Sequence, residues 1–244
     1  MKLSFVIPAY NEEKYIKTCL ESVLKQASGN DDIEVIVVDN ASTDKTKEIA
    51  KSFSGVIVVS EPKKGLVRAR QAGYLASRGD LIANIDADAI LPDGWLEKVF
   101  EKFSKHKDIV ALSGPYIYYD LPWLASVVAK VFYFFGYIVH LISNHIFKKG
   151  GMIQGGNFVL RRDALNKIGG FNVNEIEFYG EDTDVARRIR EVGKILFSFD
   201  FKMYSSARRL NKEGVIRMGF KYAINHFWVL LFKKPYTKDY IDIR

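Results

Sequence analysis

The first half of the chain alternates between short apolar runs and segments with helical spacing. The runs are nearly continuous in apolar residues and rich in β-branched ones, which is typical of parallel strands buried on both faces. Ser42-Thr43-Asp44 provides N-cap chemistry before one helical segment. We predict strands at Leu3–Ile7, Ile33–Val38, Val56–Val59 and Asp80–Ile85, and helices at Glu13–Gln26, Asp44–Phe53 and Leu66–Ser77.

This alternation of strand and helix predicts an α/β fold, with a mostly parallel sheet and helices on both faces. Ligands of such sheets bind beyond the carboxyl ends of the strands. Three polar motifs fall there, namely Pro8-Ala9-Tyr10-Asn11-Glu12, Asp39-Asn40-Ala41-Ser42 and Asp86-Ala87-Asp88. We therefore expect one binding site at this edge of the sheet.

The second half of the chain has a less regular pattern. It contains no internal repeat or clear linker, so we expect one domain over residues 1–210 and a C-terminal amphipathic helix and tail over 211–244. The predicted elements are strands at Ile109–Tyr119, Asn157–Leu160 and Ile195–Phe199, and helices from Arg162, at Glu181–Val192 and at Glu213–Phe232.

Residues 121–147 form a strongly apolar and aromatic insertion. About 20 apolar residues suffice to span a bilayer, but a single crossing would separate Asp88 from Asp182, which we expect in one site. We therefore favour a segment in the plane of the membrane interface or a hairpin of helices; a buried core insertion is the alternative. In the membrane interpretation Phe132, Phe134 and Phe135 face lipid.

The last helix has aromatic residues beside lysines, which suits the headgroup boundary of a membrane. A net charge of +7 also indicates an anionic partner: a nucleotide, a nucleic acid or a membrane surface. Basic residues are interspersed with acids and no nucleic-acid motif occurs, so we expect no nucleic-acid partner.

Two features fit a protein at the cytoplasmic face of a membrane. The single Cys19 lies in a helical pattern, which predicts a buried structural thiol in a reducing compartment. The apolar run at the N-terminus is too short for a secretory signal. We therefore expect a cytoplasmic, peripheral membrane protein.

The motif Asp86-Ala87-Asp88 carries the most specific chemistry. Two carboxylates at the end of a buried strand are costly unless a positive group lies beside them. Mg²⁺ is usually bound by one or two carboxylates plus substrate phosphates. A divalent cation with a bound diphosphate is the functional interpretation, and a solvated turn is the alternative that the motif alone leaves open.

The other strand-end residues suit a nucleotide. Asp39 could accept hydrogen bonds from the imide of uracil or the donors of guanine, and Tyr10 could stack on that base. Glu12 could accept a ribose hydroxyl or cap the following helix. Arg70, on a helix that begins after Gly65, could contact the nucleotide as well.

Two later motifs offer groups for a sugar and an acceptor. Gly155-Gly156-Asn157 would let a ligand approach the backbone, although an ordinary turn has the same pattern. Glu181, Asp182 and Asp184 begin a helix, and first-turn acids often only stabilise the helix dipole. In the functional interpretation Asp182 is the general base toward an acceptor hydroxyl.

Taken in order, these motifs resemble a family-2 glycosyltransferase of the GT-A fold. The resemblance spans roughly residues 3–210, and one departure is Gln71, where many members carry Asn. It implies a nucleotide-diphosphate sugar donor, transfer with inversion and Mg²⁺ or Mn²⁺. The matching segments are 6–12, 37–44, 69–73, 86–88, 156–157, 161–165, 168–171 and 181–184.

The resemblance also implies roles for single residues. Asp39 and Arg70 would read the base, Asp86 the ribose and Asp88 the metal, with Asp182 as the base. The nucleotide side is completed by Pro8, Ala9, Tyr10 and Glu12. The donor sugar or acceptor would contact Gly155, Gly156, Asn157, Glu181 and Arg208, the last in a segment, 205–209, that resembles one near the diphosphate in some members.

The expected function is transfer of a sugar from a UDP- or GDP-sugar to a membrane-associated acceptor, polyprenyl phosphate or a lipid-linked saccharide. A lipid phosphate is already anionic and needs no base, so Asp182 would then orient it. The alternatives are a catalytically inactive nucleotide-sugar-binding scaffold and a soluble glycosyltransferase with a non-lipid acceptor. The pattern specifies neither the sugar nor the oligomeric state.

Overall fold

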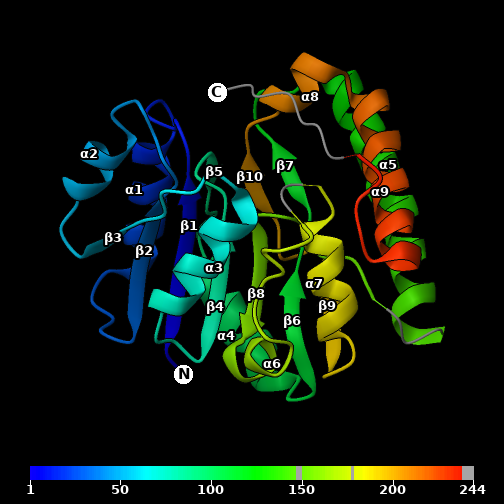
Figure 1. Cartoon of the computed structure of the whole chain (residues 1–244), viewed down its shortest axis with the longest axis horizontal. Helices are drawn as coiled ribbons and strands as arrows, with labels where there is room; N and C mark the ends of the chain where they lie inside the picture. The colour runs from blue at the N-terminus through cyan, green and yellow to red at the C-terminus, as the bar shows by residue number, and fades with distance from the viewer. Residues whose placement is uncertain (147–149, 177–178, 238–244) are drawn as a thin grey trace.

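The computed structural model of the chain describes residues 1–146, 150–176 and 179–237. A central sheet runs through this part, with seven strands among the described residues in the order β3-β2-β1-β4-β8-β6-β9 (Figure 1). The strands are β1 (Leu3–Ala9), β2 (Ile33–Asp39), β3 (Val56–Ser60), β4 (Leu81–Ile85), β6 (Ile109–Ser113), β8 (Asn157–Arg161) and β9 (Lys194–Phe197).

The strands β1 to β4 are parallel neighbours, and β9 is parallel to β6. Between β4 and β6, β8 runs antiparallel to both. β1 and β4 are buried along their whole length and β2 over most of it, as their continuous apolar sequences predicted. The predicted α/β fold with a mostly parallel sheet is therefore confirmed.

Helices cover both faces of this sheet. Alternate side chains of each strand point to opposite sides, and the apolar side chains on each side pack against helices. Phe5 packs with one group of helices and Val6 with the other. The first group is α1 (Ile16–Ala27), α2 (Thr46–Lys51) and α4 (Trp95–Lys105). The second is α3 (Leu66–Ala76), α6 (Arg162–Lys167) and α7 (Glu181–Ile189). Cys19 of α1 is fully buried, as predicted, and burial raises the pKa of its thiol.

The prediction of one strand over Ile109–Tyr119 is wrong. The chain breaks at Gly114-Pro115, and β7 (Tyr116–Tyr118) joins a small second sheet with the strand order β5-β10-β7. Proline has no N–H for a strand ladder, and a Cβ at Gly114 would overlap the backbone of Phe201. The other strands of this sheet are β5 (Ala89–Ile90) and β10 (Met203–Ser205).

The predicted last helix, over 213–232, is confirmed, and a short helix that the sequence did not predict precedes it. α8 (Arg208–Glu213) ends at Gly214, whose φ of +86° is a left-handed conformation that glycine adopts readily. The long helix α9 (Val215–Phe232) then begins and packs against α5, α7 and α8. The predicted boundary at residue 210, between the domain and the C-terminal helix and tail, stays a prediction.

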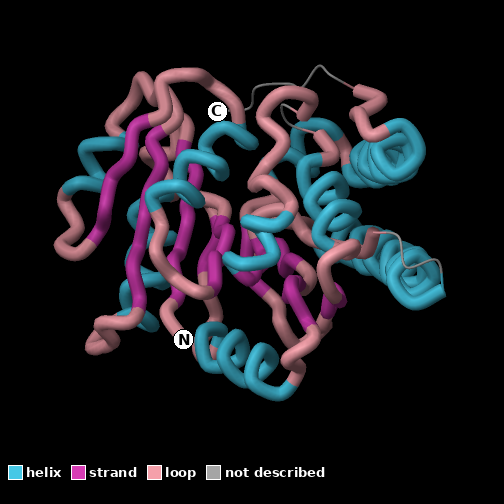
Figure 2. Tube along the Cα trace, turned by 60° about the horizontal axis from the view of Figure 1, so that its bottom comes forward, coloured by secondary structure: helices cyan, strands magenta, loops and turns pink. Residues whose placement is uncertain are grey.

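The apolar insertion forms α5 (Trp123–Leu141), which runs on into a π-helical turn, η1 (Ile142–Ile146). Of residues 123–141, all of them described, only Ala129 and His140 are buried, so the core-insertion alternative is wrong. Within residues 121–146 of the insertion the structure has one α-helix, α5, and it packs against α9. The two helices lie side by side at one end of the molecule (Figures 1 and 2).

Among the described residues, one helical segment, Trp123–Asn144, is long and apolar enough to cross a membrane by length and composition alone. The predicted insertion and its basic neighbours reach Phe147, Lys148 and Lys149, which lie outside the described residues, as do residues 238–244 of the tail.

Candidate active site

The loops that follow β1 and β2 are tied together at the carboxyl edge of the sheet. The backbone N–H of Asn11 donates to Ser42 Oγ at 3.1 Å, and that of Thr43 donates to Asn11 Oδ1 at 2.8 Å. Asn11 and Ala41 have φ values of 51° and 61°. This left-handed conformation costs about 1–2 kcal/mol for most residues with a Cβ and is enriched at functional sites. The loops therefore hold one defined shape beside Asp39.

Asp39 and Tyr10 lie at adjacent strand ends, as the sequence predicted for a base-binding pair. The buried Asp39 carboxylate accepts a hydrogen bond from the Ser42 N–H at 3.3 Å, and Lys47 Nζ lies 3.8 Å from its Oδ2. Lys64 Nζ lies 3.8 Å from the centroid of the Tyr10 ring. Two lysines thus add positive charge where a nucleotide would enter.

The buried side chain of Arg70 contacts two carboxyl groups of the site. Its Nη2 is 3.2 Å from Asp86 Oδ1 and 3.2 Å from Glu181 Oε1, and the side chain is only 1% exposed. Its Cζ lies 4.9 Å from the ring centroid of Phe158. The guanidinium thus lies between Asp86 and Glu181, and its predicted contact with the base stays a prediction.

Two adjacent carboxyl groups in this region hold their protons unusually strongly. Burial raises the pKa of Glu181 to about 8, although Arg70 acts in the opposite direction. Burial also raises the pKa of Asp182, while hydrogen bonds from Thr183 lower it. Carboxyl groups that titrate nearer neutral pH are suited to proton transfer in catalysis.

Tyr116 and two glycines position Asp86. The Tyr116 hydroxyl lies 3.0 Å from Asp86 Oδ2 and 2.7 Å from the carbonyl oxygen of Gly155, so it can donate to either. Gly156 has a φ of +79°, and a Cβ there would overlap both Asp86 and Tyr116. A Cβ at Gly155 would lie 3.2 Å from Glu181 Oε1. The close packing of acidic side chains therefore requires glycine at this turn.

Asn157 is a buried structural residue, which corrects its prediction as a ligand contact. Its Nδ2 donates to the carbonyl oxygens of Gly114 at 3.0 Å and Phe201 at 2.9 Å. Its Oδ1 accepts a hydrogen bond from Trp95 Nε1 at 3.2 Å. The side chain is fully buried, so it supports the chain behind the site.

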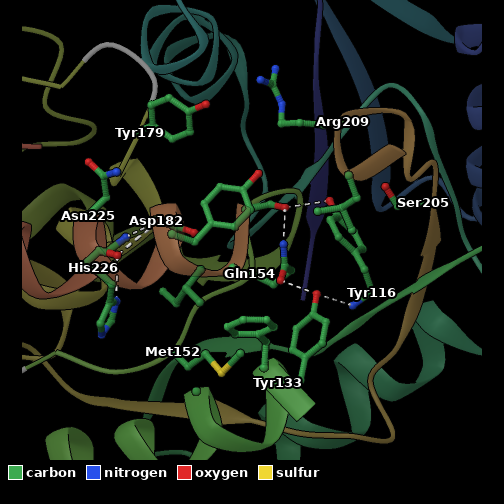
Figure 3. A pocket seen from close by; sticks show the side chains of 18 of the residues that line it. Tyr116, Tyr133, Met152, Gln154, Tyr179, Asp182, Ser205, Arg209, Asn225 and His226 are labelled. Carbon is green, nitrogen blue, oxygen red and sulfur yellow. Dashed lines mark hydrogen bonds between the residues drawn. The ribbon is translucent and has the colours of Figure 1, made fainter. Parts of the chain in front are cut away.

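Asp182 lies in the first turn of α7 and is connected to α9. Its Oδ1 accepts the Thr183 N–H at 2.7 Å, and Thr183 Oγ1 lies 3.0 Å from His226 Nδ1 (Figure 3). Burial lowers the pKa of His226 to about 4, so the imidazole is neutral at pH 7. The neighbouring Asp184 pairs with two arginines of its own helix and is structural, as a first-turn acid was expected to be.

Asp88 shares the guanidinium of Arg208 with Glu12. Arg208 Nη2 lies 3.0 Å from Asp88 Oδ2 and 2.5 Å from Glu12 Oε1, and its Cζ lies 4.7 Å from the Tyr15 ring centroid. The position of Asp88 therefore already accommodates a cation. The sequence left two roles open for Glu12, ribose binding and helix capping. In the structure its carboxylate pairs with Arg208.

A divalent metal ion would find few protein ligands here besides Asp88. Among the described residues no group of three or more His, Cys, Asp or Glu side chains converges on one point. An ion at Asp88 would therefore take most of its ligands from the diphosphate of a substrate and from water, which is the usual arrangement for Mg²⁺.

A cavity of about 760 Å³ joins these groups. Asp39, Ala9 and Tyr10 lie beside it at the ends of β1 and β2, where Ala9 is buried. The predicted site residues that line the cavity itself are Pro8, Glu12, Arg70, Asp86, Asp88, Gly155, Glu181, Asp182 and Arg208.

The sequence did not identify several residues of this cavity. Tyr133 donates its hydroxyl proton to Gln154 Oε1 at 2.6 Å and accepts the Tyr116 N–H at 3.1 Å. Figure 3 shows these side chains on the side of the cavity away from Asn225 and His226. A tyrosine-rich strand and an aromatic helix were visible in the sequence, but no motif indicated that they meet at Asp86.

Comparisons with known proteins agree with this geometry. The chain is 28% identical to glycosyltransferase AglE of Haloferax volcanii over 204 residues, which cover 81% of this chain and 64% of AglE. It is 33% identical to glycosyltransferase GlyG of Streptococcus pneumoniae over 123 residues, or 48% of this chain and 40% of GlyG. The chain thus spans less than two thirds of the length of these relatives.

Solved structures show the same fold at low identity. Mannosyltransferase PcManGT from Pyrobaculum calidifontis, in complex with GDP-Man and Mn²⁺, has a TM-score of 0.73 at 20% identity, covering 94% of this chain and 64% of PcManGT. Glucosyl-3-phosphoglycerate synthase from Mycobacterium tuberculosis, with Mn²⁺, UDP-glucose and phosphoglyceric acid, has a TM-score of 0.64 at 20% identity, covering 96% and 80%.

Two protein-family models also match the chain. Residues 140–210 match the N-terminal domain of galactosyltransferase. Residues 4–169, more than half of the chain, match Glycosyl transferase family 2. The chain therefore belongs to glycosyl transferase family 2.

Proposed function

We propose that this chain transfers a sugar, with inversion at the anomeric carbon, from a UDP- or GDP-sugar to a membrane-associated acceptor. The acceptor is polyprenyl phosphate or a lipid-linked saccharide. The observation that carries the proposal is the convergence of Asp86, Asp88, Asp182 and Arg208 on one cavity. Arg208, together with a metal ion held by Asp88, could bind an anionic diphosphate, and Asp182 could accept a proton within the same site.

The donor would lie along the ends of β1, β2 and β4. Asp39 and Tyr10 would hold the base, and Asp86 the ribose. Arg208 would contact the diphosphate, since its guanidinium pairs well with phosphate oxygens. The ligands of PcManGT and of the mycobacterial synthase support a GDP- or UDP-sugar donor and Mg²⁺ or Mn²⁺. Asp88 would hold this ion. When bound, such an ion stabilises the negative charge of the leaving nucleoside diphosphate.

The acceptor would approach Asp182 from the opposite side of the sugar. A carboxylate with a raised pKa can take the proton of an attacking hydroxyl, and attack from the face opposite the leaving group inverts the anomeric carbon. If the acceptor is a lipid phosphate, its oxygen is already anionic, and Asp182 then orients it without deprotonation.

The outer faces of α5 and α9 support a membrane location. Trp123 and Phe134 of α5 are 77% and 59% exposed, and Ile216 and Leu231 of α9 are 61% and 74% exposed. Exposed apolar surface of this extent marks an interaction site, and aromatic amphipathic helices suit the plane of a membrane interface. We propose the cytoplasmic face of the membrane as its location.

Two further observations support attachment without a crossing. Tyr118, before α5, and Gln154, after it, line the same cavity, so both ends of α5 stay with the domain. A relative from Methanococcus voltae, 28% identical over 140 residues, is named as a transferase acting on a dolichyl-phosphate-linked sugar. This name supports a lipid-linked acceptor for the present chain.

Thermal unfolding with candidate donors tests the donor half of the proposal. UDP-glucose, UDP-GlcNAc and GDP-mannose would each be added with Mn²⁺, and again with EDTA. A donor at 100 times its Kd adds about 2.7 kcal/mol to the free energy of unfolding, which raises the Tm by about 5–10 °C. One donor should give this shift with Mn²⁺ and a smaller one with EDTA. Absence of a shift with every nucleotide sugar would contradict the proposal.

Turnover then separates an enzyme from an inactive scaffold. The donor that stabilises the protein should be consumed in the presence of Mn²⁺, with membrane lipid extract as the source of acceptor, and EDTA should stop its consumption. Binding without consumption would favour the inactive nucleotide-sugar-binding scaffold.

A further inference from the structure

The cavity continues past the charged groups into the space between α5 and α9. Beyond Asp182 its walls are almost entirely aliphatic and aromatic. This part, which we call the apolar arm, is formed by Ala129, Val131, Phe132, Phe135, Gly136 and Val139 of α5 and by Val215, Gly219, Phe220, Ala223 and Phe227 of α9. Figure 3 shows Met152 and Tyr133 on one side of this space, and Tyr179 and Arg209 on the other.

The polar side chains at the edge of the apolar arm have partners within the protein. His140 Nδ1 accepts the Met152 N–H at 2.9 Å. Asn225 donates to the carbonyl oxygen of Lys221 at 2.8 Å and accepts the Thr237 N–H at 3.0 Å. His226 is bonded to Thr183. A sugar in this space would lose its hydration without replacement hydrogen bonds, which disfavours it, whereas an apolar chain loses nothing.

Small residues make the room between the helices. Phe132 and Phe220 contact each other edge to face, with ring centroids 6.0 Å apart, and set the separation of α5 and α9. Gly136 and Ala223 face the cavity without filling it. A Cβ at Gly136 would meet only the flexible end of Met152, at 3.3 Å. Larger side chains at these two positions would therefore occupy the arm.

We propose that the apolar arm holds the lipid chain of the acceptor, so that the chain leaves the membrane and lies inside the protein. This inference rests on the proposed function, since it takes the acceptor to be an amphiphile. The cavity is charged at one end and apolar at the other, which matches a phosphate or sugar head on a hydrocarbon chain. The head lies near Asp182 and Arg209, and the chain runs between α5 and α9 toward their exposed apolar faces.

Binding of farnesyl phosphate, a short isoprenoid phosphate, tests this assignment without any turnover. Calorimetric titration would compare the wild type with Ala223→Phe, which fills the arm, and with Leu231→Phe, which adds to the exposed face of the same helix. We expect Ala223→Phe to lower the affinity at least 10-fold and Leu231→Phe to leave it within 2-fold. Inorganic phosphate, which has the head but no chain, should bind all three proteins equally.

Two outcomes of the titration contradict this assignment. Equal affinity of Ala223→Phe and wild type for farnesyl phosphate, or no binding by the wild type, would overturn the inference. UDP- and GDP-sugar binding, measured on the same samples, distinguishes this failure from failure of the proposed function. If the donor still binds, the function stands and the acceptor chain lies elsewhere.

A second measurement covers the case in which Ala223→Phe does not fold. A photoactivatable farnesyl phosphate would be cross-linked to the wild type and the labelled residues identified by mass spectrometry. Labels on cavity-facing residues such as Phe132, Gly136 and Ala223 support the inference. Labels confined to outward residues such as Trp123 and Phe134 would mean that the chain stays in the bilayer, and would overturn it.

Discussion

The two ends of the cavity are built in different ways. At the charged end, Asp86 and Asp88 follow the buried strand β4, and they form ion pairs with Arg70 and Arg208. At the apolar end, two helices far apart in the sequence meet through ring contacts and leave their outer faces exposed. The charged end is thus held in place by contacts within the fold. The apolar end has exposed outer helix faces, which a membrane or another apolar partner would cover.

This difference predicts how the two ends respond to change. Substitutions at the charged end should alter chemistry and nucleotide binding and leave the fold intact. Substitutions on the outer faces of the helices should alter membrane attachment and leave the donor site unchanged.

The largest effect is expected for Asp88→Asn. Asp88 is the carboxylate assigned to the divalent ion, and without it the leaving diphosphate loses its bound charge partner. Metal-dependent turnover of the donor should be abolished, while the Tm stays within about 2 °C because Arg208 keeps its pairing with Glu12. Ordinary Mn²⁺-dependent turnover by this variant would show that the metal is held elsewhere.

Asp182→Asn should lower transfer to a hydroxyl acceptor by at least ~100-fold, the low end of general-base contributions, with donor affinity unchanged. Asp163→Asn is a matched control, because Asp163 is also an acid in the first turn of a helix but is exposed and lies away from the cavity. Near-normal transfer by Asp182→Asn would instead favour a phosphate acceptor.

Asp39→Ala should weaken nucleotide binding by about 1–3 kcal/mol, the cost of leaving buried donors of the base unpaired. Calorimetric titration with the nucleoside diphosphate of the preferred donor measures this loss of affinity. If the affinity is unchanged, Asp39 only caps the loop through its bond to the Ser42 N–H.

Acid should destabilise the protein through His226, where α9 meets α7. The folded pKa of His226, about 4, lies below the usual value of about 6.5, so the unfolded chain binds more protons between these values. The stability from His226 is complete above about pH 6.5 and falls by about 2 kcal/mol toward pH 5. Urea unfolding of His226→Asn should lack this part of the loss, whereas the variant His106→Asn, at an exposed histidine, should retain it.

The smallest effect is expected on the outer face of α5. Phe132 had been expected to face lipid with its neighbours, but it packs on Phe220. Only Phe134 and Phe135 are exposed, at 59% and 60%. Phe135 also lines the apolar arm, so Phe134→Ser alone is the variant to test. It should reduce sedimentation with anionic liposomes several-fold without a change in donor binding. Wild-type protein that never sediments with liposomes would exclude membrane attachment by this face.

The fold of the first half and the acidic motifs could be predicted because their signals are local. A buried strand followed at once by Asp86 and Asp88 places those carboxylates at the sheet edge without knowledge of any other segment. The break at Gly114-Pro115 was also present in the sequence, but the apolar and aromatic residues on both sides concealed it.

The rest of the site could not be predicted, because its contacts join segments that are far apart in the sequence. The bond between Tyr116 and Asp86 and the bond between Thr183 and His226 each depend on how distant helices and strands pack. The contacts of Arg70 are a further example of pairs that the sequence does not predict. Its position on α3 was correct, but only the packed structure shows Asp86 and Glu181 as its partners.

One measurement tests most directly whether the charged and apolar ends form a single site for an amphiphilic acceptor. The preferred nucleotide sugar, radiolabelled in the sugar, would be incubated with the protein, Mn²⁺ and liposomes that contain polyprenyl phosphate. Label should pass into the organic phase with wild-type protein and should remain in the aqueous phase with Ala223→Phe. Aqueous label alone with the wild type, despite consumption of the donor, would contradict a lipid-linked acceptor.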